Sequence, residues 1–367
     1  MGPLRSHPLN PVPQHLPHQH PAQPLRGLDL VSSITGRSAI DELPGGDGRP
    51  PLEADRASTG RLGDRIFGGL ATGSGIFVIA LVTLVGVFLI AQAVPSLMNN
   101  NVNFLTSREW EPAGAEPRFG IVDLLWATVT TSLIAMVIAV PLGVAVALFI
   151  TQYAPTWLSK PAAALVDLLA AVPSIVYGFW GLQVAGQYFE PVAKGVDSVL
   201  GWLPFFDYTG TPSAKSTLAF AGVILAIMIL PIITAISREV FNQVPTAHKE
   251  AALALGATKW EMIRTAVLPF GKPGIISAAM LGLGRALGET LAVTILLSGL
   301  NASDAFRSTI FNGGATFASK IALAANEFDS AQKTGAYIAA GLVLFILTFI
   351  VNAAARVVID RRKAFTE

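Results

Sequence analysis

Long apolar runs alternate with short polar connections along the chain from residue 72 onward. Six of these runs approach or exceed the ~20 residues that an α-helix needs to cross the hydrocarbon core of a bilayer: residues 72–94, 121–150, 161–185, 216–236, 274–298 and 336–358. The pattern predicts an all-α polytopic membrane protein, with six transmembrane helices inside a membrane domain of residues 63–367.

Residues 1–62 have a different composition, rich in Pro, Gly, Gln and His, with neither helical nor strand periodicity. Such a segment buries too little apolar surface to offset its ordering entropy, so we expect a disordered cytoplasmic tail. His15, His18 and His20 lack acidic or thiolate companions and indicate a solvated tail rather than a metal site. No signal peptide opens the chain, because the first apolar run begins near Thr72. An overextended start codon is an alternative origin of the tail.

Basic residues gather on one side of the predicted spans. They precede the first span, separate the second from the third, crowd the connection between the fourth and fifth, and follow the sixth: Arg56, Arg61, Arg65, Lys160, Arg238, Lys249, Lys259, Arg264, Lys272, Arg356, Arg361, Arg362 and Lys363. Because positively charged connections stay in the cytoplasm, this bias predicts that both termini are cytoplasmic. Arg307, Lys320 and Lys333 on the opposite side weaken the contrast.

The composition agrees with a protein that lives mainly in membrane lipid. Hydrophobic residues make up 52% of the chain and charged residues 13%, against about one-quarter charged in an average soluble domain. The net charge of +1 indicates almost nothing about partners, because the side of the bilayer on which charges fall matters more than their sum. No basic domain argues for a nucleic-acid partner. The absence of cysteine excludes a disulfide framework, thiolate metal sites and a cysteine nucleophile. No His/Asp/Glu cluster gathers within the spans, so neither a metal site nor a catalytic constellation is expected.

Two residues of opposite charge, Arg285 and Glu289, lie one helical turn apart near the middle of the fifth run. An ionised side chain at this depth costs at least ~2.5–3.5 kcal/mol, so it persists mainly where it faces water, a partner or a substrate. The pair therefore predicts a conduit for a polar solute. The alternative is an internal pair that neutralises itself, although cation before anion is the less favourable order on a helix. Gly284 and Gly288 beside them are expected to let a neighbouring helix approach closely.

Hydroxyl groups and a helix interruption mark the second and third runs. The second carries a series of hydroxyls around Thr131, and the third is interrupted at Pro173-Ser174 and followed by Tyr177. Polar groups and broken backbone at membrane depth suit a cavity, which makes Thr131, Ser174 and Tyr177 secondary candidates for the pathway. Ordinary interhelical packing explains the same residue types.

The connection between the fourth and fifth runs is too polar to span a membrane, and it predicts two short helices. Thr246 is expected to cap the first helix, which stops at Gly256. Thr258 and Glu261 form a capping box for the second helix, which Pro269 is expected to end. A compact helix pair is suited to transmit conformational changes from a cytoplasmic subunit that drives transport. The alternative, an amphipathic hairpin on lipid, predicts more bulky apolar side chains.

This connection contains Glu250-Ala251-Ala252, Gly256 and Leu268-Pro269. Together these residues closely resemble the EAA loop of ABC-importer permeases, which docks into a groove on the ATPase subunit. The pattern normally has isoleucine two places before Leu-Pro, where this chain has Ala266, and this departure is expected to loosen packing locally.

Other segments narrow the resemblance to the permeases of phosphate importers. They are Val172–Gly181, Gly282–Val293 and the external segment Phe104–Trp110, and the similarity covers roughly residues 66–363. The family implies type I ABC-importer permease architecture, with the coupling-helix loop at about residues 245–270. It also implies a bacterial cytoplasmic membrane location.

The partners implied by the resemblance are a homologous second permease subunit, two cytoplasmic ATPase subunits and an extracytoplasmic phosphate-binding protein. The chain has no G-x-x-x-x-G-K-[ST] loop, so we expect a transport subunit that hydrolyses no ATP, is not an enzyme and holds no cofactor. Glu250, Ala251, Ala252, Gly256, Leu268 and Pro269 would couple it to the ATPase.

The resemblance also suggests how Arg285 and Glu289 act on inorganic phosphate. Arg285 can meet a tetrahedral oxyanion with a bidentate fork. Glu289 can accept a hydrogen bond from the P–OH group, which monohydrogen phosphate carries and sulfate lacks. An unpaired buried acceptor costs ~1–3 kcal/mol, so Glu289 would help to reject sulfate.

Two other functions remain open from the sequence. A permease for another oxyanion, such as sulfate or molybdate, shares the EAA loop. An autonomous ion-coupled carrier belongs to a different class, and the ATPase-docking loop and the lack of convincing inverted repeats argue against it.

Overall fold

The computed structural model describes residues 61–297, 307–325 and 328–363. Nearly all of the predicted tail, residues 1–62, lies outside these ranges. The chain divides into two units, Met1–Ser74 and Gly75–Glu367. Helix α2 (Arg61–Met98) begins in the first unit and continues into the second.

The described residues contain five helices that are long and apolar enough to cross a membrane: Gly63–Met98, Val122–Tyr153, Leu218–Asn242, Lys259–Gly288 and Ala331–Val357. A sixth crossing results if α4 (Thr156–Ala170) and the segment Ser174–Leu200, which are bent by 91°, count as one broken span. The polytopic all-α architecture predicted from the sequence is confirmed.

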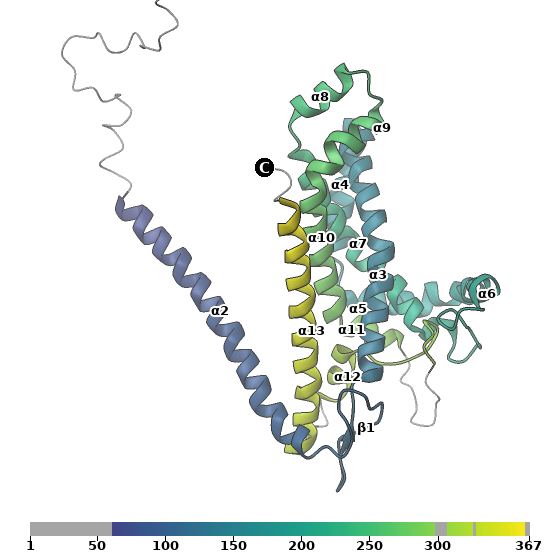
Figure 1. The fold of residues 1–367 in the computed structure, drawn as a ribbon. Helices are drawn as coiled ribbons and strands as arrows, with labels where there is room; N and C mark the ends of the chain where they lie inside the picture. The colour runs from purple at the N-terminus through teal and green to yellow at the C-terminus, as the bar shows by residue number, and fades with distance from the viewer. Residues whose placement is uncertain (1–60, 298–306, 326–327, 364–367) are drawn as a thin grey trace, which may run out of the picture. The chain divides into compact units, whose positions relative to one another are not determined.

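The larger unit begins within α2, which is followed by a β-hairpin and then by helical elements almost throughout. The hairpin pairs β1 (Trp110–Glu111) antiparallel with β2 (Arg118–Phe119), Trp110 opposite Phe119. The first half continues with α3 (Val122–Leu148), η3 (Phe149–Tyr153), α4, α5 (Ser174–Trp180), η4 (Gly181–Ala185), η5 (Gly186–Tyr188), α6 (Phe189–Leu200), η6 (Ala214–Ser216) and α7 (Leu218–Asn242). The second half contains α8 (Thr246–Ala254), α9 (Lys259–Met262), η7 (Ile263–Val267), α10 (Leu268–Gly288), α11 (Leu291–Leu296), α12 (Phe317–Leu323) and α13 (Ala331–Lys363). Figure 1 shows α8 and α9 at one end of this unit and α12 with the hairpin at the other.

Helix α7 forms the centre of the larger unit, packed between α3 and α10. Its apolar side chains Ile224, Ile229 and Ile233 are almost completely buried. Glycines at the crossing points permit this packing: a Cβ on Gly222 would lie 2.7 Å from Ile134 of α3, and one on Gly282 of α10 would lie 2.9 Å from Ile233. Small residues at such contacts let membrane helices approach closely.

Two glycines of α10 offer a matched test of this packing. A Cβ on Gly274 would lie 2.4 Å from Val240 of α7, whereas a Cβ on Gly284 would meet no described atom within 4 Å. We expect Gly274→Ala to destabilise the purified permease by ~1–3 kcal/mol through overpacking. Gly284→Ala should be neutral or stabilising by up to ~1 kcal/mol, because alanine favours the helix. Thermal unfolding in detergent measures both, and identical curves for the two variants would contradict the packing.

The connection between α7 and α10 confirms part of the predicted helix punctuation. Gly256 has a positive φ of 84°, a conformation that favours glycine, and α8 stops just before it. The capping box is present, since the Glu261 N–H donates to Thr258 Oγ1 at 3.3 Å and the Thr258 N–H donates to Glu261 Oε2 at 2.8 Å. Thr246 is not a cap, so that prediction is wrong. Pro245, with its fixed φ, takes the N-cap position and leaves Thr246 in the first turn.

Pro269 does not end the second helix, which is a further correction. The helical segment runs from Lys259 to Gly288 and changes to a π-helical turn at Ile263–Val267. Leu268 continues the ladder by donating to the Ile263 carbonyl. Pro269 then occupies the first turn of α10, a position that tolerates its missing N–H and its fixed φ. The predicted second coupling helix is therefore continuous with the fifth span.

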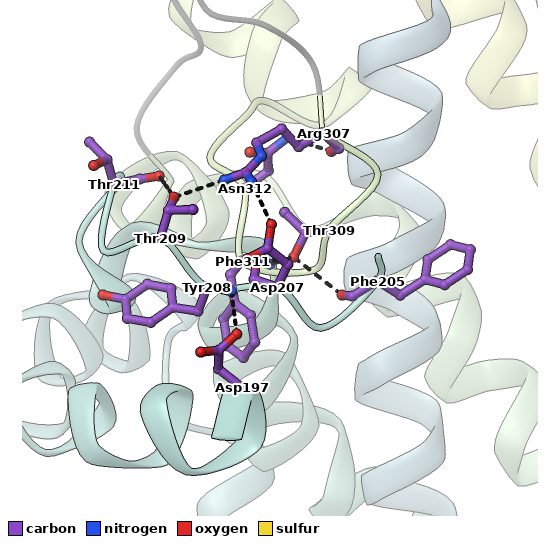
Figure 2. A network of polar contacts seen from close by, with 10 residues as sticks. All are labelled: Asp197, Phe205, Asp207, Tyr208, Thr209, Thr211, Arg307, Thr309, Phe311 and Asn312. Carbon is purple, nitrogen blue, oxygen red and sulfur yellow. Dashed lines mark hydrogen bonds and ion pairs between the residues drawn. The ribbon is translucent and has the colours of Figure 1, made fainter. Parts of the chain in front are cut away.

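Polar contacts join the connection after α6 to the segment before α12 at the hairpin end of the unit (Figure 2). Arg307 forms an ion pair with Asp207 and donates to Thr209 Oγ1 at 2.9 Å. Asn312 Nδ2 donates to the Arg307 carbonyl at 2.6 Å, and Thr309 Oγ1 donates to the Asp207 carbonyl at 2.8 Å. These contacts cross-link two connections that are far apart in the sequence.

Tyr208 strengthens the same end of the unit. Its backbone N–H donates to Asp197 Oδ1 at 3.0 Å (Figure 2), and its hydroxyl donates to Glu190 Oε2 at 2.7 Å. Burial, together with the hydrogen bond to Glu190, raises the pKa of Tyr208 to about 12. The hydroxyl therefore stays protonated, and keeps donating, at neutral pH.

Candidate functional site

The fifth span is broken at Glu289. Helix α10 ends at Gly288, Glu289 has extended backbone with φ −68° and ψ 125°, and α11 begins at Leu291. Glycine weakens the helix at this point. Glu289 Oε1 then accepts the backbone N–H of Ala292 at 3.2 Å, which satisfies a free donor in the first turn of α11. The predicted fifth span is therefore not one continuous helix, because Arg285 lies in the last turn of α10 and Glu289 is the C-cap residue that follows it.

The third span is broken where the sequence predicts the interruption. Helix α4 ends at Ala170, Pro173 takes the N-cap position of α5, and Ser174 begins the new helix. Tyr177 fixes the bend, because its hydroxyl donates to the carbonyl of Leu169 at 2.9 Å across the break. The Leu169 carbonyl at the end of α4 also accepts the Val172 N–H at 3.3 Å, so the Tyr177 hydroxyl is an additional partner across the bend.

The helices that follow the two breaks pack against each other. A Cβ on Gly178 of α5 would lie 3.0 Å from Ala292 Cα of α11, and one on Gly181 would lie 3.3 Å from Leu296. The close packing against α11 explains why the segment Val172–Gly181 has glycine at these two positions. Irregular backbone at membrane depth is tolerated where it is buried in protein or lines a water-filled cavity. The paired breaks therefore mark the candidate site.

Arg285 lies in the last turn of α10, directly before the break at Glu289. Its side chain is half-buried, and its Nε atom is buried with no hydrogen-bond partner among the described residues. Across the described ranges, no carboxylate forms an ion pair with its guanidinium, including Glu289, which is 9% exposed and caps α11. The structure thus shows no carboxylate partner for the Arg285 guanidinium among the described residues of this chain.

Thr131 and Ser174 have different surroundings. Thr131 is 1% exposed, and its hydroxyl donates to the carbonyl of Ala127 in its own helix at 2.7 Å. Its backbone carbonyl lies against Gly222 of α7, so Thr131 belongs to the α3–α7 contact. Ser174 is half-buried at the start of α5. The pathway roles of all five residues remain predictions.

The residues that resemble the EAA loop divide into an exposed group and a packed group. Glu250 and Ala251 are exposed on α8, whereas Ala252 packs on the apolar cluster around Phe241, Val244 and Ile263. Leu268 packs against the same cluster, and Pro269 follows it at the start of α10. Gly256 terminates α8. The exposed face of α8 is thus separate from the face that joins it to the membrane helices.

A Cβ atom added to Gly284 or to Gly288 would have no other atom of the described residues within 4 Å. A close-packed helix at these two glycines would have to come from another subunit, so its presence stays a prediction.

Two features of this site were not predicted from the sequence. The break at Glu289 lacks a proline, and its only signal is a glycine followed by two polar residues in an apolar run. The bond from Tyr177 to the Leu169 carbonyl depends on the 91° bend between the two helical segments, which sequence spacing does not reveal.

Comparison with known proteins identifies the group to which the chain is related. Residues 139–364 match the family described as binding-protein-dependent transport system inner membrane component. The phosphate transport system permease protein PstC 2 of Mycobacterium bovis is 49% identical over 312 residues, which cover 84% of this chain and 96% of that protein. PstC of Mycobacterium leprae is 52% identical over 274 residues, covering 74% and 85%. PstC of Mesorhizobium japonicum is 37% identical over 326 residues, covering 86% and 97%.

The family match covers more than half of the chain, and the relatives are similar over most of their length. The chain therefore belongs to the inner membrane components of binding-protein-dependent transport systems and, among these, to the PstC family of phosphate transport system permease proteins.

Proposed function

We propose that this chain is the permease subunit of an ATP-driven importer of inorganic phosphate and forms half of its translocation pathway. The names of the relatives support the substrate. The observation that carries the proposal is the guanidinium of Arg285, which lies in a membrane span directly before a helix break and has no carboxylate partner in the described ranges. An uncompensated cation at this depth is costly unless an anion is received there.

Glu289 is proposed to contribute selectivity beside Arg285. Its Oε1 atom accepts the Ala292 N–H, which leaves Oε2 as the acceptor for a ligand hydroxyl. Monohydrogen phosphate offers such a P–OH group, and sulfate does not. A fully ionised anion would leave the acceptor unpaired at ~1–3 kcal/mol, which corresponds to roughly 5- to 150-fold discrimination.

The proposed partners are a second homologous permease subunit, two ATPase subunits and an external phosphate-binding protein. In this arrangement the exposed face of α8 docks on an ATPase, which supplies all ATP hydrolysis, and α8 with both chain termini lies in the cytoplasm. The pairing of basic residues at the opposite end supports this orientation. Arg307 pairs with Asp207, and Lys333 pairs with Asp329 at 3.6 Å, so these external cations are compensated.

Uptake by the reconstituted complex tests the proposed substrate. Proteoliposomes that contain this chain with its permease, ATPase and binding-protein partners should accumulate radiolabelled phosphate when ATP is supplied. A large excess of sulfate or molybdate should not compete. In Glu289→Gln, which keeps an acceptor for the α11 cap but loses the charge, discrimination against sulfate should fall by roughly 5-fold or more.

Two results would contradict the proposal. ATP-driven uptake of sulfate or molybdate in preference to phosphate would assign the chain to another oxyanion. Uptake by this chain alone in liposomes, without ATP, would indicate an autonomous carrier.

A further inference from the structure

A second contact between a guanidinium and a carboxylate lies between α7 and α4. Arg238 Nη2 donates to both carboxylate oxygens of Asp167, each at 3.2 Å. The sequence analysis placed Arg238 in the polar connection after the fourth run. Helix α7 instead continues to Asn242, so Arg238 lies inside a candidate membrane span.

The geometry leaves part of the Arg238 guanidinium unused. Only Nη2 contacts the carboxylate, whereas a full fork would use two nitrogens in parallel. Nη1 is buried and has no hydrogen-bond partner within the described ranges. A buried donor without a hydrogen-bond partner is unfavourable. An anion with more acceptor oxygens than the Asp167 carboxylate could therefore accept hydrogen bonds from both Nη1 and Nη2.

The carboxylate side of this contact is open. The Asp167 side chain is 53% exposed and that of Arg238 is 19% exposed. Exposed charge within a membrane span avoids lipid and faces water or protein. No described residue of this chain covers the side of Arg238 that Asp167 occupies, so an anion could approach it from there if that side faces water.

The packing register of α10 on α7 places Arg238 relative to Arg285. Gly274 lies against Val240, and Gly282 lies against Ile233, so α10 and α7 run in opposite directions. Continuing this register puts Arg285 level with about residue 230 of α7. At 1.5 Å per residue, Arg238 lies roughly 12 Å nearer the α8 end than Arg285. Along the axis of α7, Arg238 therefore lies on the α8 side of Arg285.

We infer that Arg238 is a second anion-binding position on the exit side of Arg285, with Asp167 as its resident counter-ion. This inference rests on the proposed phosphate transport. The anion displaces Asp167 from Nη2 on arrival, and the return of the carboxylate displaces the anion toward the α8 end. Asp167 therefore limits how long Arg238 retains the anion, which keeps the second position from becoming a trap.

A purely structural clamp between α4 and α7 would use the same contact, and charge-neutral variants separate the two roles. The complete transporter is reconstituted with wild type, Arg238→Gln, Asp167→Asn and the double variant, and assembly is checked by co-purification. Phosphate uptake is measured with and without phosphate in the compartment that faces the ATPase subunits. Arg238→Lys, which keeps a cation, serves as the second variant if Arg238→Gln fails to assemble.

The anion position predicts opposite effects for the two single variants. Arg238→Gln should slow uptake roughly tenfold or more, through loss of a charge-assisted hydrogen bond. Asp167→Asn should remain active but become more sensitive to inhibition by phosphate on the ATPase side. The double variant should match Arg238→Gln. Arg238→Lys should retain partial uptake, because a point charge replaces the planar fork.

Uptake at the wild-type rate in Arg238→Gln would overturn the inference. If only Arg238→Lys assembles, wild-type uptake in that variant together with unchanged phosphate inhibition in Asp167→Asn would overturn it as well. Recovery of uptake in the double variant would do the same, because it would indicate a clamp whose remaining charge is harmful when unpaired. Failure of the wild-type complex to transport phosphate would instead refute the proposed function.

Discussion

Replacement of Arg285 by Gln is expected to reduce phosphate uptake by the assembled transporter at least about 100-fold. A bidentate contact supplies two charge-assisted hydrogen bonds of ~1.5–3 kcal/mol each, and glutamine offers a single neutral donor group. Arg285→Lys should give an intermediate rate, because lysine keeps the charge but lacks the fork. Initial rates of radiolabelled phosphate uptake in proteoliposomes measure both variants.

This experiment requires a check that the loss is not a folding defect. Because Arg285 has no hydrogen bond or ion pair within the described residues, its removal should leave co-purification of the ATPase subunits and thermal unfolding unchanged. Wild-type uptake in Arg285→Gln would show that the anion passes without using this guanidinium.

Replacement of Ala251 by Trp is expected to abolish uptake by a different route. Ala251 is exposed on α8, next to Ala252, which packs on the apolar cluster beneath the helix. A bulky side chain on the exposed face leaves that cluster intact but obstructs a partner that approaches α8 closely. The ATPase subunit should no longer co-purify, and ATP-driven uptake should fall to background.

The same bulk at the other end of the unit provides the control. Ala113 is an exposed alanine in the β1–β2 connection, so Ala113→Trp should leave the ATPase subunit bound. Ala251→Ser, which barely changes the volume, should retain uptake. If Ala251→Trp keeps a stably bound ATPase and normal uptake, α8 is not the docking element.

The overall fold was accessible from the sequence because membrane crossings depend on long apolar runs. Every predicted run corresponds to a candidate span, including the broken third one. Pro173 gave a local reason for that break, since proline disfavours helical backbone before it and removes a donor. Gly256 and the Thr258–Glu261 box were equally local signals, and both are present.

The errors arose where local signals compete with the surrounding hydrogen-bond ladder. Pro269 was expected to end a helix, but a π-helical turn before it lets the chain continue. Glu289 was placed on a continuous helix, whereas its side chain caps the following one instead. The contact between Arg238 and Asp167 joins positions 71 residues apart, so only the packing of α4 on α7 reveals it.

The site itself could be predicted only in part. Arg285 was singled out because a charge in an apolar run is conspicuous, and its role stays a prediction. The position of Tyr177 depends on how α5 packs on α11, and the contacts of Gly178 that permit this packing are long-range. Hydroxyl groups such as Thr131 gave an ambiguous signal, because a back-bonded hydroxyl in a helix contact and a pathway hydroxyl have the same sequence pattern.

The most direct test of the central claim is a structure of the assembled transporter with phosphate bound, trapped by an ATPase subunit that binds but does not hydrolyse ATP. The account predicts phosphate oxygens within ~2.7–3.2 Å of the Arg285 guanidinium nitrogens. A structure with Arg285 paired to a carboxylate of this chain or a partner, and phosphate passing elsewhere, would contradict it.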